Sequence, residues 1–72
     1  MAWALAENSN QSGQYVSGLD GSGQPTWTTH LEEAAWAPKQ STVDLYIQHN
    51  NIQNVTSKTI GGNHPGTKPP IS

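Results

Sequence analysis

The sequence predicts an α+β fold, in which a three- to four-stranded antiparallel sheet packs on one main helix. Two observations indicate this class. One stretch carries the start signal, apolar stripe and stop signal of a helix, and a strong turn signal separates two strand-like segments ahead of it. The 72 residues are enough for one domain. We place that domain at residues 1–60 and expect residues 61–72, rich in Gly and Pro, to form a flexible tail.

The predicted helix spans residues 41–51, Ser-Thr-Val-Asp-Leu-Tyr-Ile-Gln-His-Asn-Asn. Ser41 is a favourable N-cap residue, and Asp44 follows at the spacing of a capping box. Asn50-Asn51 supplies a residue that tolerates the left-handed conformation ending many helices, and Ile52 can fold back onto the last turn. The apolar stripe consists of Val43, Leu45, Tyr46 and Ile47. Because a helix shorter than about 12 residues is marginal in water, we expect a sheet to cover this stripe.

Three strands are expected before the helix. In residues 2–6 large and small side chains alternate, so Trp3 and Leu5 are predicted to lie on one buried face. Residues 14–19 read as the second strand. Residues 26–29, Thr-Trp-Thr-Thr, read as the third, because Thr and Trp favour strands.

Turn and capping signals connect these elements. Residues 20–25, Asp-Gly-Ser-Gly-Gln-Pro, are the strongest turn signal in the chain. Thr29 is a predicted cap with Glu32 three residues later, which indicates a short helix that Pro38 prevents from continuing. Residues 52–60 complete the order strand, strand, strand, short helix, helix, strand.

Large apolar side chains are few, and the three tryptophans are expected to dominate the core. The residues expected to be buried are Trp3, Leu5, Tyr15, Val16, Leu19, Trp27, Leu31, Trp36, Val43, Tyr46, Ile47, Ile52 and Val55. A sheet that a helix covers on one side leaves its other face open, and aromatic residues on such a face are favoured anchors for a partner. The candidate partner-binding residues are Trp3, Val16, Trp27 and Trp36. A free sheet edge also allows a homodimer.

Charge is sparse and slightly acidic. The charged residues are Glu7, Asp20, Glu32, Glu33, Asp44, Lys39, Lys58 and Lys68. Nucleic-acid binders cluster Lys and Arg, because neutralising phosphates supplies most of their affinity. Three scattered lysines and no arginine therefore argue against nucleic acid as a partner. Weak binding of a single strand by exposed aromatic residues remains the alternative function.

No pattern in the sequence indicates catalysis. The three histidines, His30, His49 and His64, lack the close spacing of a metal site. Glu32 and Glu33 are adjacent, and adjacent helical residues do not face each other, so they make a poor acid–base pair. The Gly-rich residues 18–23 lack the lysine of a phosphate loop. We therefore expect a protein that is not an enzyme, with no catalytic residues, no metal and no cofactor.

The order of the fold-determining positions resembles small, mostly uncharacterised phage- and prophage-encoded proteins, built as a β-meander followed by a capped helix. The residues that carry the resemblance are Gly13-Gln14-Tyr15-Val16, Trp27-Thr28, Leu31-Glu32-Glu33-Ala34-Ala35-Trp36 and Ser41. They lie within residues 2–60, and the resemblance implies fold and origin more than activity.

The resemblance and the lack of catalytic patterns together suggest a phage or prophage accessory protein that acts by protein–protein interaction. Its role would be that of a host-factor inhibitor or a minor virion component. The sequence has no secretory signal pattern and no run of the ~20 apolar residues that span a bilayer. The expected location is thus the cytoplasm of a bacterial host or the virion, without membrane contact.

Overall fold

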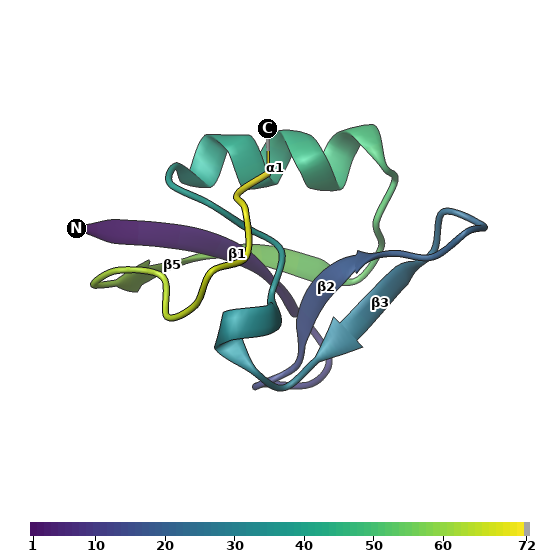
Figure 1. Ribbon diagram of the computed structural model, residues 1–72. Coiled ribbons are helices and arrows are strands. Elements are labelled where there is room, and N and C mark those ends of the chain that lie inside the picture. Colours follow the sequence, from purple (N-terminus) through teal and green to yellow (C-terminus); the bar gives the residue numbers. More distant parts are fainter. Residues whose placement is uncertain (72) are drawn as a thin grey trace.

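The computed structural model describes residues 1–71 and shows an α+β domain, a five-stranded antiparallel sheet with one helix (Figure 1). In chain order the elements are β1 (Ala2–Asn8), β2 (Tyr15–Leu19), β3 (Pro25–Thr28), the 3₁₀ helix η1 (Leu31–Glu33), β4 (Trp36–Ala37), α1 (Gln40–His49) and β5 (Val55–Gly61). The predicted fold class is confirmed, and β4 is a short strand that the sequence pattern did not indicate. Ser72, the last residue of the predicted tail, lies outside the described residues.

Strand β1 is the centre of the sheet. Along one edge it pairs with β5 over its whole length, from Ala2 opposite Gly61 to Asn8 opposite Val55. Its other edge is shared, because β4 pairs with it at Ala4 and Leu5 and β2 pairs with it near its end. Strand β3 extends the sheet beyond β2. Every strand but β3 therefore bonds directly to β1.

Both faces of β1 are buried. Ala4 and Ala6 lie in a core cluster beneath α1, with Val16, Ala37, Val43 and Ile52. Trp3 and Leu5 lie in a second cluster on the opposite face, with Ala34. The prediction that only the Trp3 and Leu5 face is buried is wrong, because the small alanines let the helix approach the sheet closely. Trp3, Ala4, Leu5 and Ala6 are each at most 2% exposed.

Helix α1 is confirmed, but its predicted start is wrong. It begins at Gln40 after an extended Lys39, and no side chain caps its amino end, because Ser41 already lies inside the first turn. Its end follows the prediction: Asn51 has a φ of 53°, and Ile52 donates to the carbonyl of Ile47 at 3.1 Å. Across residues 1–71, no helix is long and apolar enough to span a membrane.

The short helix η1 also lacks its predicted cap. His30, not Thr29, precedes it, and the His30 side chain makes no capping hydrogen bond. The Thr28 hydroxyl instead accepts a hydrogen bond from the His30 amide at 3.1 Å. Thr28 therefore fixes the exit from β3, and a single 3₁₀ turn lies between β3 and β4.

The predicted turn between β2 and β3 is confirmed. The Asp20 amide donates to the carbonyl of Gln24 at 2.8 Å, and Gly23 has a φ of 85°, which glycine adopts without strain. One Asp20 carboxylate oxygen accepts three hydrogen bonds, from the Ser22 hydroxyl at 2.7 Å, the Ser22 amide at 2.9 Å and the Gln24 amide at 3.0 Å. These bonds lower the pKa of Asp20, with the Ser22 hydroxyl as the largest cause.

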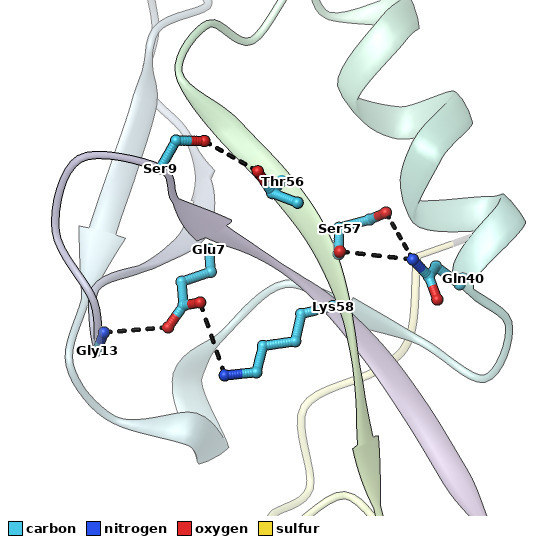
Figure 2. A network of polar contacts seen from close by, with 7 residues as sticks. All are labelled: Glu7, Ser9, Gly13, Gln40, Thr56, Ser57 and Lys58. Carbon is cyan, nitrogen blue, oxygen red and sulfur yellow. Dashed lines mark hydrogen bonds and ion pairs between the residues drawn. The ribbon is translucent and has the colours of Figure 1, made fainter.

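Polar side chains tie β5 to the rest of the fold (Figure 2). The Glu7 carboxylate lies between the Gly13 amide, which donates to it at 3.1 Å, and the Lys58 ammonium at 3.6 Å. On the helix side, the Gln40 side chain donates to the Ser57 hydroxyl at 3.0 Å. The start of α1 and the loop after β1 are thereby fixed to neighbouring strands.

The C-terminal segment, residues 62–71, packs against the domain, contrary to the loose tail that its composition predicts. It runs from the end of β5 back across the domain to α1 (Figure 1). The His64 ring stacks on Trp36 with centroids 4.3 Å apart. The Trp36 indole donates to the Lys68 carbonyl at 2.8 Å, and the Ile71 amide donates to the Trp36 carbonyl at 2.7 Å. The helix α1 covers only the alanine face of β1. The segment packs on the opposite face, where burial of Trp3 and Trp36 stabilises it.

Ala4→Leu should destabilise the fold by about 1–3 kcal/mol, because extra methylenes have no room between β1 and α1. Urea unfolding followed by circular dichroism measures this. Leu45→Ala is the matched control: Leu45 is 53% exposed, so its loss should change the free energy of unfolding by less than ~0.5 kcal/mol. Equal effects of the two changes would contradict the tight alanine interface.

Asp20→Asn should destabilise the hairpin near neutral pH, since the ionised carboxylate accepts the turn's hydrogen bonds best. The folded-state pKa of Asp20 is lowered from its ordinary value of 3.8. Its contribution is therefore fully present above pH 3.8 and is lost as the pH falls through the lower folded-state pKa. Melting temperatures of both proteins across this range should converge at the acid end. A constant difference at every pH would contradict this account.

Truncation after Gly62 should lower the free energy of unfolding by ~1–2 kcal/mol, because Ile71 loses apolar burial and the Trp36 indole loses its acceptor. For a domain of this size, each kcal/mol corresponds to roughly 4–8 °C in melting temperature. Thr67→Ala is the control, because Thr67 is exposed in the same segment. An unchanged melting curve after truncation would mean that the segment does not support the fold.

Candidate functional site

A surface hollow lies between the β2–β3 hairpin, η1 and the C-terminal segment. We call it the acidic groove, and it has a volume of about 630 Å³. Its lining residues are Ser17, Trp27, Thr28, Glu32, Glu33, Gly66, Thr67 and Lys68. Four separate parts of the chain therefore meet in it, and only the fold brings them together.

Trp27 is the aromatic residue of this groove, and its exposure follows from the geometry of the sheet. It is 36% exposed and lies directly opposite Val16 across the β2–β3 pair. Opposite residues on paired strands point to the same face. Val16 is buried beneath α1, in the cluster that contains Val43. Trp27 lies one strand further out, where the helix no longer covers the sheet.

A second, smaller hollow adjoins Trp27 on the side of the α1–β5 loop. Its volume is about 400 Å³, and its lining is rich in side-chain amides, with no charged residue. The lining residues are Gly23, Gln24, Pro25, Trp27, Asn50, Asn51, Gln53 and Asn54. Trp27 therefore forms a ridge between an acidic and a neutral hollow.

Two carboxylates on η1 give the acidic groove its charge. The Glu33 carboxylate accepts a bond from the Thr28 hydroxyl at 3.5 Å, and Glu32 lies 3.8 Å from the His30 ring nitrogen. The Glu32 and His30 side chains are 53% and 65% exposed. Glu33 is exposed as well. Both carboxylates are thus accessible to a ligand in solvent.

The Lys68 ammonium does not neutralise these carboxylates directly. Its Nζ donates to the backbone carbonyl of Ser17 at 2.6 Å and to that of Glu33 at 2.8 Å. The lysine therefore joins β2 to η1 through backbone groups. The carboxylates remain the charged groups of the groove that can receive a basic side chain from outside.

The structure separates the four candidate partner-binding residues. Trp3 and Val16 are 2% and 0% exposed, so their predicted place on an open face is wrong. They are covered because the C-terminal segment lies over one face of β1 and α1 over the other. Trp36 is half-buried beneath the same segment. Trp27, which was also expected in the core, is exposed and remains the one available anchor of the four.

Sequence reasoning missed Glu32, Glu33 and Lys68 as members of one site. The sequence predicted the two glutamates only as solvent-exposed charges in the first turn of a helix. Nothing in the sequence places Lys68 beside Ser17 and Glu33, which precede it by more than 30 positions. Within residues 1–71, no group of three His, Asp or Glu side chains is arranged to hold a metal ion. His64 lies between Trp3 and Trp36, away from His30.

Comparison with family models, with curated proteins and with solved structures gives no match. The function is therefore argued from the geometry of the groove.

Proposed function

We propose that this protein is a non-enzymatic binding module that acts by protein–protein interaction through the acidic groove. The observation that carries the proposal is the exposed indole of Trp27 beside two solvent-accessible carboxylates. Tryptophan is strongly enriched among the residues that dominate binding energy at protein interfaces. A chain with so few large apolar residues that leaves one of its tryptophans at the surface has a contact site there.

The chemistry of the groove favours a basic partner segment. A lysine or arginine side chain can lie over the indole face, where a cation is attracted within about 6 Å of the ring. From that position its donors reach toward Glu32 and Glu33, which line the same groove. Each exposed ion pair contributes little, ~0–1 kcal/mol, so the aromatic contact supplies affinity and the carboxylates supply selectivity.

Within this class we favour a phage or prophage accessory protein, either a host-factor inhibitor or a minor virion component. The order of strands, short helical turn and helix supports this origin through its resemblance to such proteins. The cytoplasm of a bacterial host or the virion is then its place of action. A second copy of the chain is a further possible partner, since β3 and β5 each pair with one strand among residues 1–71 and keep an outer edge.

Binding of single-stranded nucleic acid ranks below protein binding. Trp27 offers a base one stacking surface, as such modules do. The adjoining carboxylates repel phosphates, however, and the ammonium of Lys68 is engaged by two carbonyl groups. A titration with single-stranded DNA at low salt compares the two functions, and tight, salt-sensitive binding would reverse this ranking.

Trp27→Ala should weaken binding of the physiological partner at least tenfold, about 1.4 kcal/mol. The partner is first captured from a bacterial lysate with the wild-type protein, and its dissociation constant is then measured by calorimetry. A variant with both Glu32→Gln and Glu33→Gln should lose affinity and much of the salt dependence. Leu45→Ala, which removes another exposed apolar side chain, is the control.

All of these variants should keep the wild-type melting temperature within a few degrees, because Trp27 and both glutamates are exposed. Unchanged affinity in Trp27→Ala, or a partner that contacts the protein through an acidic surface, would overturn the proposal.

A further inference from the structure

We propose that the surface beneath the C-terminal segment is a docking site for an extended Lys-Pro-Pro-aliphatic peptide, which the chain's own Lys68–Ile71 occupies. We call this surface the strap site. It consists of the Ser17 and Glu33 carbonyls, Trp36, and the side of α1 next to Ile71. A partner peptide of the same pattern would take the place of the chain's own segment.

Two backbone carbonyls recognise the lysine by accepting hydrogen bonds from its ammonium group. Lys68 Nζ donates to the Ser17 carbonyl at 2.6 Å and to the Glu33 carbonyl at 2.8 Å. These carbonyls come from β2 and η1, so the subsite exists only in the folded domain. A backbone carbonyl accepts an ammonium proton but has none to donate. The subsite therefore selects a donor side chain and rejects an acidic one.

Trp36 forms hydrogen bonds with the peptide backbone on both sides of the proline pair. Its indole Nε1 donates to the carbonyl of Lys68 at 2.8 Å, and its own carbonyl accepts from the amide of Ile71 at 2.7 Å. The two residues between, Pro69 and Pro70, have no amide proton that needs a partner. Proline-rich segments bind to aromatic-lined sites in this way, because their extended form costs little ordering entropy.

The aliphatic position contacts the core. Ile71 packs against the cluster beneath α1, and it lines a hollow with Tyr46 and Leu45 of the helix. Its side chain is half-buried. A branched aliphatic residue three positions after the lysine therefore completes the pattern that the site recognises.

One feature favours displacement of the chain's own segment. Its docking leaves polar atoms unpaired: among the described residues, both ring nitrogens of His64 and Nε1 of Trp3 are buried without a hydrogen-bond partner. Because unpaired buried polar atoms oppose docking, the segment is held less tightly than its remaining contacts allow.

The strap site borders the acidic groove and shares Ser17 and Lys68 with it, but the two proposals rest on different chemical groups. The strap site uses the backbone carbonyl of Glu33, whereas the groove uses the carboxylates. Failure of one proposal therefore leaves the other standing. Trp27→Ala and the double glutamine variant test the groove, and changes at Trp36, Lys68 and Ile71 test the strap site.

The experiment uses the full chain and a synthetic peptide with the sequence of residues 64–71, His-Pro-Gly-Thr-Lys-Pro-Pro-Ile. The Lys68→Ala, Ile71→Ala double variant weakens the chain's own segment, and Lys39→Ala is its control. Tryptophan fluorescence then measures the peptide's affinity. We expect the double variant to bind the peptide at least tenfold more tightly than the wild type or the control, in which the linked segment competes at an effective concentration on the order of millimolar.

A peptide with alanine in place of lysine should bind the double variant at least tenfold more weakly. Equal affinity of the peptide for the wild type and the double variant, or no binding to either, would overturn the proposal. Should the double variant not fold, the wild type still decides the question by two-dimensional NMR with the peptide in excess. Displacement moves the Lys68 and Ile71 amide signals to random-coil positions while the Trp36 indole signal stays near its original shift, and unchanged signals refute the site.

Discussion

The burial of β1 on both faces is the constraint from which the rest of the structure follows. Five neighbouring segments, β2, β4, β5, α1 and the C-terminal segment, are arranged around this one strand. Its alanines accept the helix, and Trp3 and Leu5 fill the space on the other side. A chain of this size buries only about 60% of its unfolded surface, so a single strand covered on both faces concentrates most of the available burial in one place.

This arrangement explains why a Gly- and Pro-rich end is ordered. The one helix covers the alanine face, and the Trp3 face has only η1, β4 and the C-terminal segment to cover it. His64 contacts both Trp3 and Trp36, with ring centroids at 4.9 and 4.3 Å. Composition alone predicts flexibility for such a segment, but composition does not register an apolar surface contributed by residues 60 positions away. Long-range packing decides the outcome here.

The local features could be read from the sequence, and the long-range ones could not. The helix, the Asp20 turn and the first strand depend on residues within a few positions, and each was predicted correctly as an element. The capping box at Ser41 failed because the cap position is Lys39, two residues earlier, a shift within the ordinary uncertainty of element boundaries. Of the candidate site, Trp27 was among the predicted residues. Glu33 joins it through the short turn after β3, whereas Lys68 joins it only because the C-terminal segment returns to the sheet.

The different roles of the tryptophans follow from where their strands lie relative to β1. Trp3 is on β1 itself and is fully enclosed. Trp36, on the strand next to it, is half-covered, and the covering segment bonds both to its indole and to its carbonyl. Trp27, two strands out, has no layer above it. The exposure of a tryptophan therefore rises with the distance of its strand from β1. Trp3 is a core residue, Trp36 contacts the C-terminal segment, and Trp27 is accessible from solvent.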